Sequence, residues 1–184
     1  MIWESSYWKN DLLKTARKLG RKKNKKRWPE RALVNFEKEL FISFYSIRKL
    51  IEANKISTDL IKTIITAKSY PSLGKVVTSM NWHKIDELYD FSTSNIEKIS
   101  LKFICNQLIH SYVFMTSFNE NSQLTGILFS SDRYRNKKLF SVDINDVIGI
   151  LRKVGSNYPN SVTLKYDEKK KDYIITSQMM KNQE

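Results

Sequence analysis

The spacing of hydrophobic residues changes along the chain, from a helical period in the first third to an alternating period in the last. From Ser5 to Gly20, leucine and alanine recur every three or four residues, which predicts an amphipathic helix that ends at the glycine. A second helix is predicted from Pro29, which suits a first helical position, to about Ala53. Its apolar residues occupy more than one side, so we expect it to be central and packed by several neighbours.

The middle of the chain is predicted to interrupt the helices with a hairpin. Residues 62–80 are rich in β-branched side chains on both sides of the turn-forming sequence PSLG, which predicts two paired strands. A short helix is expected over residues 81–91, and a longer one from residue 95 to about residue 112. The longer helix contains the apolar stretch LKFICNQLIHSY (101–112), which we expect to pack against the second helix.

The last third alternates hydrophobic and polar residues and is predicted to be β-rich. Hairpins are expected over residues 113–131 and 161–178, with a strand at 139–143 and a short helix at 144–155 between them. The fold class is therefore α+β: N-terminal helices with an inserted hairpin, followed by a mostly antiparallel sheet with one short helix. We expect residues 1–112 to form a mainly helical core and residues 113–184 a β-rich part packed on it, within one compact domain.

The charge of the chain narrows the class of partner. Lysine and arginine number 32 against 19 acidic residues, which gives a net charge of +13. This balance favours an anionic partner: nucleic acid first, then an anionic membrane surface or an acidic protein. The alternative is a lysine-rich composition shared by a whole genome, which produces the same excess of charge without any ligand.

Other features of the composition exclude several classes of protein. No apolar run approaches the roughly 18 residues of a membrane span, and the N-terminus lacks the apolar region of a signal peptide. One cysteine allows no intrachain disulfide, and with two histidines it is too few for a Cys/His zinc site. We therefore expect a cytoplasmic protein that does not enter the membrane and needs no metal or other cofactor.

Two basic stretches are the candidate nucleic-acid contacts. The first, residues 17–27, holds eight basic residues in eleven positions and is expected to leave the first helix as a loop. The second precedes the strand at 139–143 and is expected at a hairpin rim. Trp3, Trp8 and Trp28 offer stacking surfaces if they are exposed, although packing against the second helix is the expected alternative. The candidates are Arg17, Lys18, Arg21, Lys22, Lys23, Lys25, Lys26, Arg27, Arg133, Arg135, Lys137 and Lys138.

A polar pair within the stretch 101–112 is the candidate catalytic site. Asn106 and His110 are four residues apart, which places both on one face of a helix. The run CNQLIHSY resembles the signature helix of the HEPN superfamily, small helical domains that include many metal-independent ribonucleases of toxin–antitoxin and phage-defence systems. The family pattern is an arginine, commonly followed by asparagine, then three residues and a histidine. Asn106 and His110 match this pattern, and Cys105 stands in place of the arginine.

The resemblance implies that the arginine and the histidine bind the scissile phosphate and assist the attack of the ribose 2′-hydroxyl, usually at a dimer interface. With Cys105 at the arginine position, this helix lacks the main cation that stabilises a pentacovalent phosphate. Asn106 and His110 are then hydrogen-bonded groups at the edge of the core, or a degenerate site kept for dimerisation or RNA contact. The third interpretation is an active site that takes its cation from elsewhere, with the candidates Arg48, Arg133 and Arg135.

The leading hypothesis is a basic nucleic-acid-binding protein that prefers RNA to DNA. The resemblance adds a bacterial defence or toxin–antitoxin setting, with the stretch 101–112 as a degenerate HEPN-like helix. The alternative from another class is a protein–protein interaction module, either an accessory subunit of a larger complex or a homodimer. A metal-independent ribonuclease that uses His110 is the third hypothesis, and the missing arginine makes a non-enzymatic role the first expectation.

Overall fold

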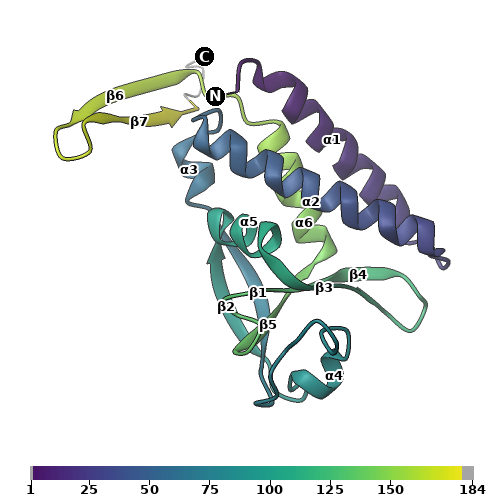
Figure 1. Ribbon diagram of the computed structural model, residues 1–184. Coiled ribbons are helices and arrows are strands. Elements are labelled where there is room, and N and C mark those ends of the chain that lie inside the picture. Colours follow the sequence, from purple (N-terminus) through teal and green to yellow (C-terminus); the bar gives the residue numbers. More distant parts are fainter. Residues whose placement is uncertain (1, 180–184) are drawn as a thin grey trace.

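The computed structural model describes residues 2–179 and has an α+β fold (Figure 1). Its helices are α1 (Ser5–Lys22), α2 (Glu30–Glu52), α3 (Thr58–Ile61), α4 (Ile85–Leu88), α5 (Leu101–Ile109) and α6 (Ile144–Gly155). Its strands are β1 (Ile64–Pro71), β2 (Asn95–Ser100), β3 (Ser111–Phe118), β4 (Leu124–Ser131), β5 (Lys138–Asp143), β6 (Ser161–Asp167) and β7 (Asp172–Gln178). The predicted fold class is confirmed.

Strands β1 to β5 form one sheet in the order β2-β1-β5-β4-β3, in which every pairing is antiparallel. β5 lies at the centre of this sheet. Tyr70 of β1 pairs with Leu139 of β5, and Phe129 of β4 pairs with Phe140 of β5. Strands from the first and the last parts of the chain therefore share one sheet, while β6 and β7 form a separate pair that projects from the body (Figure 1).

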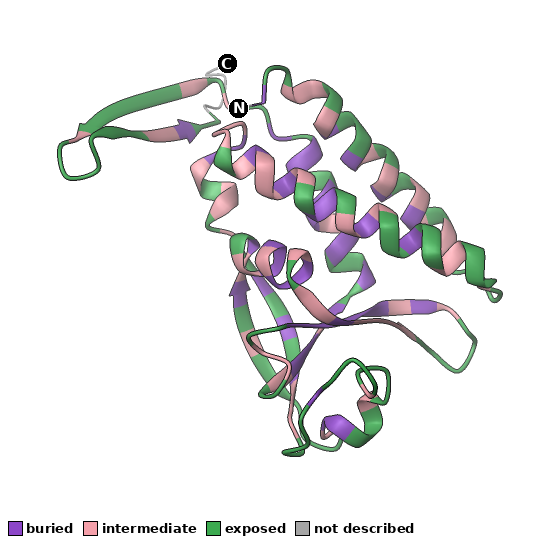
Figure 2. Ribbon diagram, in the orientation of Figure 1, coloured by how far each residue is buried: buried purple, intermediate pink, exposed green. Residues whose placement is uncertain are grey.

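Helices cover one face of the five-stranded sheet, and the main hydrophobic core lies between the two layers (Figure 2). The inward side of α2 carries a stripe of buried side chains, namely Phe36, Leu40, Phe44, Ile47 and Leu50. α5 packs against α2 and β4, as the apolar stretch at 101–112 predicted, and α1 packs against α6 and α2. α2 therefore packs against α5 and α1, but it is not covered on every apolar side as predicted, because Ile42 and Tyr45 are 54% and 50% exposed.

The contact between α1 and α6 is close because Gly155 has no side chain. A Cβ atom at this position would lie 2.7 Å from Cγ of Leu13 and 3.0 Å from the carbonyl oxygen of Lys9. The Lys9 side chain is itself buried, with its ammonium 4.0 Å from the centre of the Tyr158 ring. Burial is the main reason that the pKa of Lys9 falls to about 8.

The opposite face of the sheet is covered by the connection between β1 and β2, residues 72–94, which contains α4. Leu88 and Tyr89 of this connection belong to one buried cluster with Leu128 of β4. The Tyr89 hydroxyl donates a hydrogen bond of 2.7 Å to the Arg135 carbonyl oxygen and so ties the connection to the loop between β4 and β5. The connection thus forms a second, smaller core on this face.

The prediction of a hairpin at 62–80 is wrong in its second strand. β1 forms as expected, but its antiparallel neighbours are β2 and β5, and residues 75–80 form no strand. Asn81 supplies a physical reason, because its side-chain oxygen accepts the Thr78 N–H and its side-chain nitrogen donates to the Val76 carbonyl oxygen. These local bonds use backbone groups that a strand would need for pairing.

The two helices predicted next along the chain are shorter than expected. Within residues 81–91 only α4 is α-helical, and residues 95–100 form β2 instead of the first turns of a helix. Ile99 of β2 enters the core from the sheet. The Ser100 side chain then accepts the Phe103 N–H and caps the start of α5. A strand pairing with β1 therefore replaces the first third of the predicted helix.

α1 is longer than the sequence predicted. It continues through Gly20, where a stop was expected, and ends at Lys22. Leu19 is buried in the core, and its carbonyl oxygen accepts the Lys23 N–H, so the last turn is held in spite of the glycine. The later elements, both C-terminal hairpins together with β5 and α6, are confirmed.

Candidate nucleic-acid interface

The first basic stretch gathers at the C-terminal end of α1. The stretch begins on the last turns of the helix and leaves it as a loop after Lys22, as predicted. Two cations outside the stretch join it, one from earlier in α1 and one from α6. We call this surface the α1 cluster: Lys14, Arg17, Lys18, Arg21, Lys22, Lys23, Lys25, Lys26, Arg27 and Arg152.

Two hollows run over the α1 cluster. The first has a volume of about 530 Å³, and every residue that lines it is cationic: Lys14, Arg17, Lys18, Arg21, Lys22 and Lys25. The second, of about 380 Å³, lies between α1 and α6, where Arg152 joins Arg21 and Lys23. Arg152 was not predicted, because the close packing of α6 on α1 is what brings it beside the basic stretch.

Few carboxylates neutralise the α1 cluster. Lys14 pairs with Asp11 at 2.9 Å, and Lys18 pairs with Glu39. Within residues 2–179, no other member of the cluster has a carboxylate within ion-pair distance. A surface with this uncompensated charge attracts anions, and it releases counterions when phosphates bind.

The tryptophans near the first basic stretch are divided between packing and exposure. Trp28 packs edge-on against Phe36, with ring centroids 6.1 Å apart, and its indole N–H donates to the Lys25 carbonyl oxygen. Trp8 is half-buried against the core. Trp3 is 97% exposed, but it precedes the far end of α1, roughly 25 Å from the cluster. The α1 cluster therefore offers phosphate contacts rather than a stacking surface.

The second basic stretch is divided by its contacts. Arg135 lies over the Tyr112 ring, 3.8 Å from its centre, and its Nε is 3.3 Å from the Asp132 carboxylate. Arg133 and Lys137 are exposed. Arg135 therefore holds the loop between β4 and β5 on the sheet, and the two exposed cations remain available to a ligand.

Lys138, the last predicted contact of this stretch, bridges strands instead. Its ammonium donates to the Glu97 carboxylate of β2 at 2.6 Å, and the Ser69 hydroxyl donates to the same oxygen. Burial alone would raise the pKa of Glu97, but the bonds from Lys138 and Ser69 outweigh burial and lower it. Lys138 thus joins β5 to β2 across β1.

The two basic stretches lie at opposite ends of β4. At its start, the Leu124 N–H donates to the Lys23 carbonyl oxygen at 2.9 Å, and at its end Ser131 leads into the loop that carries Arg133. A strand of eight residues spans roughly 25 Å. The stretches therefore form two separate surfaces.

A pocket of about 600 Å³ lies at the end of β4 that is distant from the α1 cluster. Its lining includes Arg48, Asn106, His110, Ser131, Arg133 and Tyr134. α5 ends at Ile109, and the His110 N–H donates to the Asn106 carbonyl oxygen. The two residues therefore lie one turn apart at the C-terminal end of the helix. The structure thus brings the predicted polar pair to an open pocket together with two arginines.

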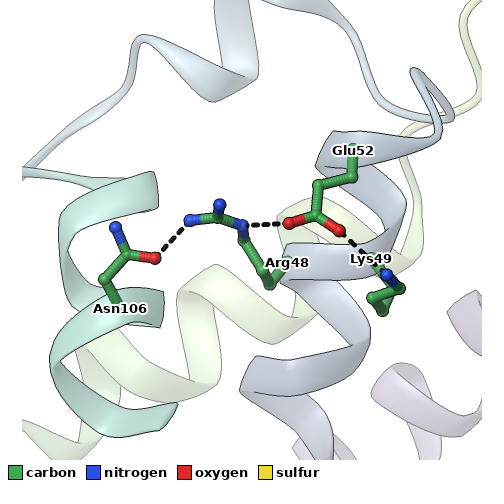
Figure 3. Close-up of polar contacts among 4 residues, drawn as sticks. All are labelled: Arg48, Lys49, Glu52 and Asn106. Atoms are coloured by element: carbon green, nitrogen blue, oxygen red, sulfur yellow. Dashed lines mark hydrogen bonds and ion pairs between the residues drawn. The ribbon is translucent and has the colours of Figure 1, made fainter. Parts of the chain in front are cut away.

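Arg48 reaches this pocket from α2 (Figure 3). Its Nε donates to the Glu52 carboxylate at 2.6 Å, and its Nη1 donates to the side-chain oxygen of Asn106. Lys49 donates to the second oxygen of Glu52 at 2.9 Å, and the bonds from Arg48 and Lys49 lower the pKa of Glu52. Of the three candidate arginines, Arg48 is the one that contacts the predicted pair directly, and its guanidinium is held from two sides.

Cys105 lies in the core rather than in the pocket. Its side chain is fully buried, and this burial raises the pKa of the thiol to about 12. The thiol is therefore protonated near neutral pH and shielded from reagents. The guanidinium beside Asn106 comes from α2, and position 105 faces the interior of the fold.

Comparison with other proteins adds no functional label to these surfaces. No protein-family model matches the chain, and neither the curated proteins nor the solved structures give a significant match. Between residues 2 and 179, no three side chains of histidine, cysteine, aspartate or glutamate are grouped so as to hold a metal ion. Over the same range, no helix combines the length and the apolar character that crossing a bilayer requires.

Proposed function

We propose that this protein binds nucleic acid, RNA in preference to DNA, and that the α1 cluster makes the main contact with the phosphate backbone. The observation that carries the proposal is the hollow on α1 that only lysine and arginine line. Such a surface binds a chain of phosphates without reading bases, since each cation contacts a phosphate independently. The preference for RNA, and a place in a bacterial defence or toxin–antitoxin system, rest on the resemblance of residues 101–112 to the HEPN helix.

A pair of matched charge reversals tests this proposal. The first variant carries Lys22→Glu, Lys25→Glu and Lys26→Glu in the α1 cluster. The control carries Lys62→Glu, Lys68→Glu and Lys98→Glu, three exposed lysines on or beside β1 and β2. Both variants change the net charge by the same amount, so only the position of the charge differs between them.

The measurement is the affinity for a fluorescent single-stranded RNA as a function of salt concentration. We expect the wild-type affinity to fall steeply with salt, because each neutralised phosphate of a single strand contributes roughly 0.7 to the logarithmic slope. The cluster variant should lose about two units of this slope and most of the affinity at low salt, and the control should keep the slope. Equal losses in both variants, or a wild-type affinity that ignores salt, contradict the proposal.

A second candidate function, a metal-independent ribonuclease, is favoured by the arginines that line the pocket with His110. In this reaction the His110 imidazole takes the proton of a ribose 2′-hydroxyl, and the 2′-oxygen attacks the adjacent phosphorus. The bond to the 5′-oxygen breaks, that oxygen takes a proton from water, and a 2′,3′-cyclic phosphate remains. Arg48 and Arg133 supply the positive charge that stabilises the pentacovalent phosphate.

The chain provides a matched control for this reaction, because it has only two histidines and the other, His83, is exposed in the connection on the opposite face of the sheet. We expect His110→Ala to abolish RNA cleavage in the presence of a chelator, and His83→Ala to leave it unchanged. The 2′,3′-cyclic phosphate end is detected by mass spectrometry. Cleavage that survives in His110→Ala, or that requires added metal, rules this activity out.

A further inference from the structure

The hairpin of β6 and β7 projects from the body of the molecule and is largely exposed (Figures 1 and 2), and one of its faces is apolar. Residues directly opposite in an antiparallel pair share a face, and here Leu164 pairs with Ile175 and Tyr166 with Tyr173. Val162 lies on the same face, two residues before Leu164. Leu164 is 60% exposed and Tyr173 is 58% exposed. Five apolar side chains therefore form a strip on which no other layer of the described residues packs.

Within residues 2–179, the hairpin is anchored to the rest of the chain only at its base. The Ser177 N–H donates to the Thr58 hydroxyl at 3.1 Å, and the Ser177 hydroxyl donates to the Asn54 carbonyl oxygen. Beyond this base the hairpin is a two-stranded ribbon, and such a ribbon is only marginally stable in water by itself. The exposed apolar face is thus a surface that gains stability from being covered.

A second uncovered apolar surface lies between α1 and α2. A groove of about 360 Å³ runs there, lined by Tyr7, Trp8, Leu12 and Ile42 together with several polar residues. Tyr7 is 73% exposed and Ile42 is 54% exposed. Tyr45, one turn after Ile42 on α2, extends the apolar surface beyond the groove. The hairpin points away from α1 and α2 (Figure 1), so it does not cover the groove of its own chain.

We propose that a second copy of this chain covers both surfaces, with the hairpin of each copy lying in the groove between α1 and α2 of the other. This arrangement is a symmetric dimer in which two identical contacts are made, because each copy donates a hairpin and receives one. The dimer is independent of the proposed RNA binding, because neither the hairpin nor the groove includes a member of the α1 cluster.

The areas of the two surfaces favour this arrangement over a dimer in which only the two hairpins pack face to face. Each half-exposed side chain on the hairpin face leaves roughly 100 Å² open, so four such residues offer roughly 400 Å², and the groove with its neighbours offers a similar area. Reciprocal exchange uses both surfaces twice and buries roughly 1,600 Å², the size of a stable specific interface. Two hairpins packed face to face would bury only half as much, which is the size of a weak contact.

The net charge gives the dimer a salt dependence opposite to that of RNA binding. Two chains that each carry +13 repel one another at low salt, and added salt screens this repulsion while it leaves apolar burial intact. We therefore expect salt to strengthen the dimer and to weaken RNA binding. The two proposals can fail separately, because their readouts move in opposite directions along the same titration.

Sedimentation velocity of the full chain over a wide range of concentrations tests the proposal. The hairpin variant is Leu164→Thr with Tyr173→Thr, which keeps residues that favour a strand, and the groove variant is Tyr7→Ser with Ile42→Ser. The control, Ile64→Thr with Ile96→Thr, removes two equally exposed side chains from β1 and β2. We expect the wild type and the control to be dimers and the hairpin and groove variants to be monomers with unchanged circular dichroism.

Mixing the two monomeric variants tests whether the hairpin of one copy binds the groove of the other. The hairpin variant keeps an intact groove, and the groove variant keeps an intact hairpin, so one of the two contacts can form in the mixture. We expect a heterodimer that is weaker than the wild-type dimer and absent from either variant alone. A mixture that stays monomeric up to the solubility limit overturns the proposal.

Further results would also overturn it. A wild type that is monomeric at every concentration and salt contradicts the dimer. A groove variant that stays dimeric shows that the hairpin is covered by something else, such as a second hairpin. If the wild type is monomeric and the hairpin variant loses RNA affinity, the ribbon binds nucleic acid instead.

Discussion

The two ends of β4 carry the same sign of charge in two different arrangements. At the start of the strand, the α1 cluster gathers cations of which, in the described part of the chain, only Lys14 and Lys18 are paired with acids. At the other end, the pocket around His110 contains Arg48, whose guanidinium is held by Glu52 and Asn106. The unpaired cations of the α1 cluster stay hydrated and can adjust to a ligand, while the guanidinium of Arg48 is held in one position.

This difference separates two tasks in phosphate recognition. Adjustable cations supply affinity for any stretch of backbone, and this affinity depends strongly on salt. A fixed guanidinium supplies geometry, because its remaining N–H donors point in set directions. We therefore expect substitutions at the α1 cluster to change affinity, and substitutions at the pocket to change stability and the handling of one bound phosphate.

The largest effect on stability is expected on α5, where Cys105 faces the core and Asn106 faces the pocket. Cys105→Arg places a charge in the core, and we expect the free energy of unfolding to fall by roughly 4 kcal/mol or more. The neighbouring change Asn106→Arg faces the open pocket, loses the bond from Arg48, and should cost only about 1–2 kcal/mol. Urea unfolding followed by circular dichroism measures both. Equal losses in the two variants would show that position 105 has access to the pocket.

The next effect compares the two ends of β4 in RNA binding. Arg17→Glu with Arg21→Glu reverses two exposed cations of the α1 cluster, and we expect the affinity for single-stranded RNA at low salt to fall roughly 100-fold. Arg133→Glu with Lys137→Glu reverses two exposed cations at the other end and should cost less than about fivefold. Fluorescence anisotropy measures both affinities. Comparable losses would mean that one RNA strand runs along β4 and contacts both ends.

A smaller effect on stability distinguishes the held arginine from the adjustable ones. Arg48→Met removes the donors to Glu52 and Asn106, and we expect it to lower the free energy of unfolding by about 1–2 kcal/mol. Arg21→Met removes an exposed cation without a carboxylate partner and should stay within about 0.5 kcal/mol of the wild type. The measurement is again urea unfolding. A loss in Arg21→Met as large as that in Arg48→Met would remove the distinction.

The smallest effect concerns pH at the pocket end of β4. The pKa of Glu97 in the folded protein is lowered from its ordinary value of 4.5, so the unfolded chain takes up the proton first as the pH falls. The pair with Lys138 therefore stabilises the fold above this value, and its contribution, expected to be below about 1 kcal/mol, is lost as the pH decreases below 4.5. We expect Glu97→Gln to flatten this part of the stability profile. If Glu97→Gln loses stability at low pH as steeply as the wild type, other carboxylates cause this loss.

The parts of the fold that the sequence predicted well depend on local patterns. α2, α6 and the two C-terminal hairpins carry clear periods between strong turn signals, and their bounds agree closely with the structure. The failures at 75–80 and 95–100 have a different origin. There the residues suit more than one local structure, and pairing with the distant strands β1 and β5 decides which of them form a strand.

The candidate site shows the same limit. Asn106 and His110 were found because helical spacing alone places them together. Arg48 was one of three arginines that could supply a cation, and only the packing of α2 on α5 selects it. Arg152 carried no signal at all, because its neighbours in the α1 cluster are far away in sequence. Residues that are close in sequence can thus be grouped into a site from the sequence alone, whereas distant residues that meet in the fold cannot.

The position of β5 has a consequence for the synthesis of the protein. It is the last strand of the five-stranded sheet along the chain, yet it lies between β1 and β4. While a ribosome has not yet released residues 138–143, the strand pair β2–β1 and the hairpin β3–β4 each present an open edge to the cell. Open edges recruit strands from other chains, so a nascent chain is most exposed to aggregation just before β5 emerges and closes both edges in one step.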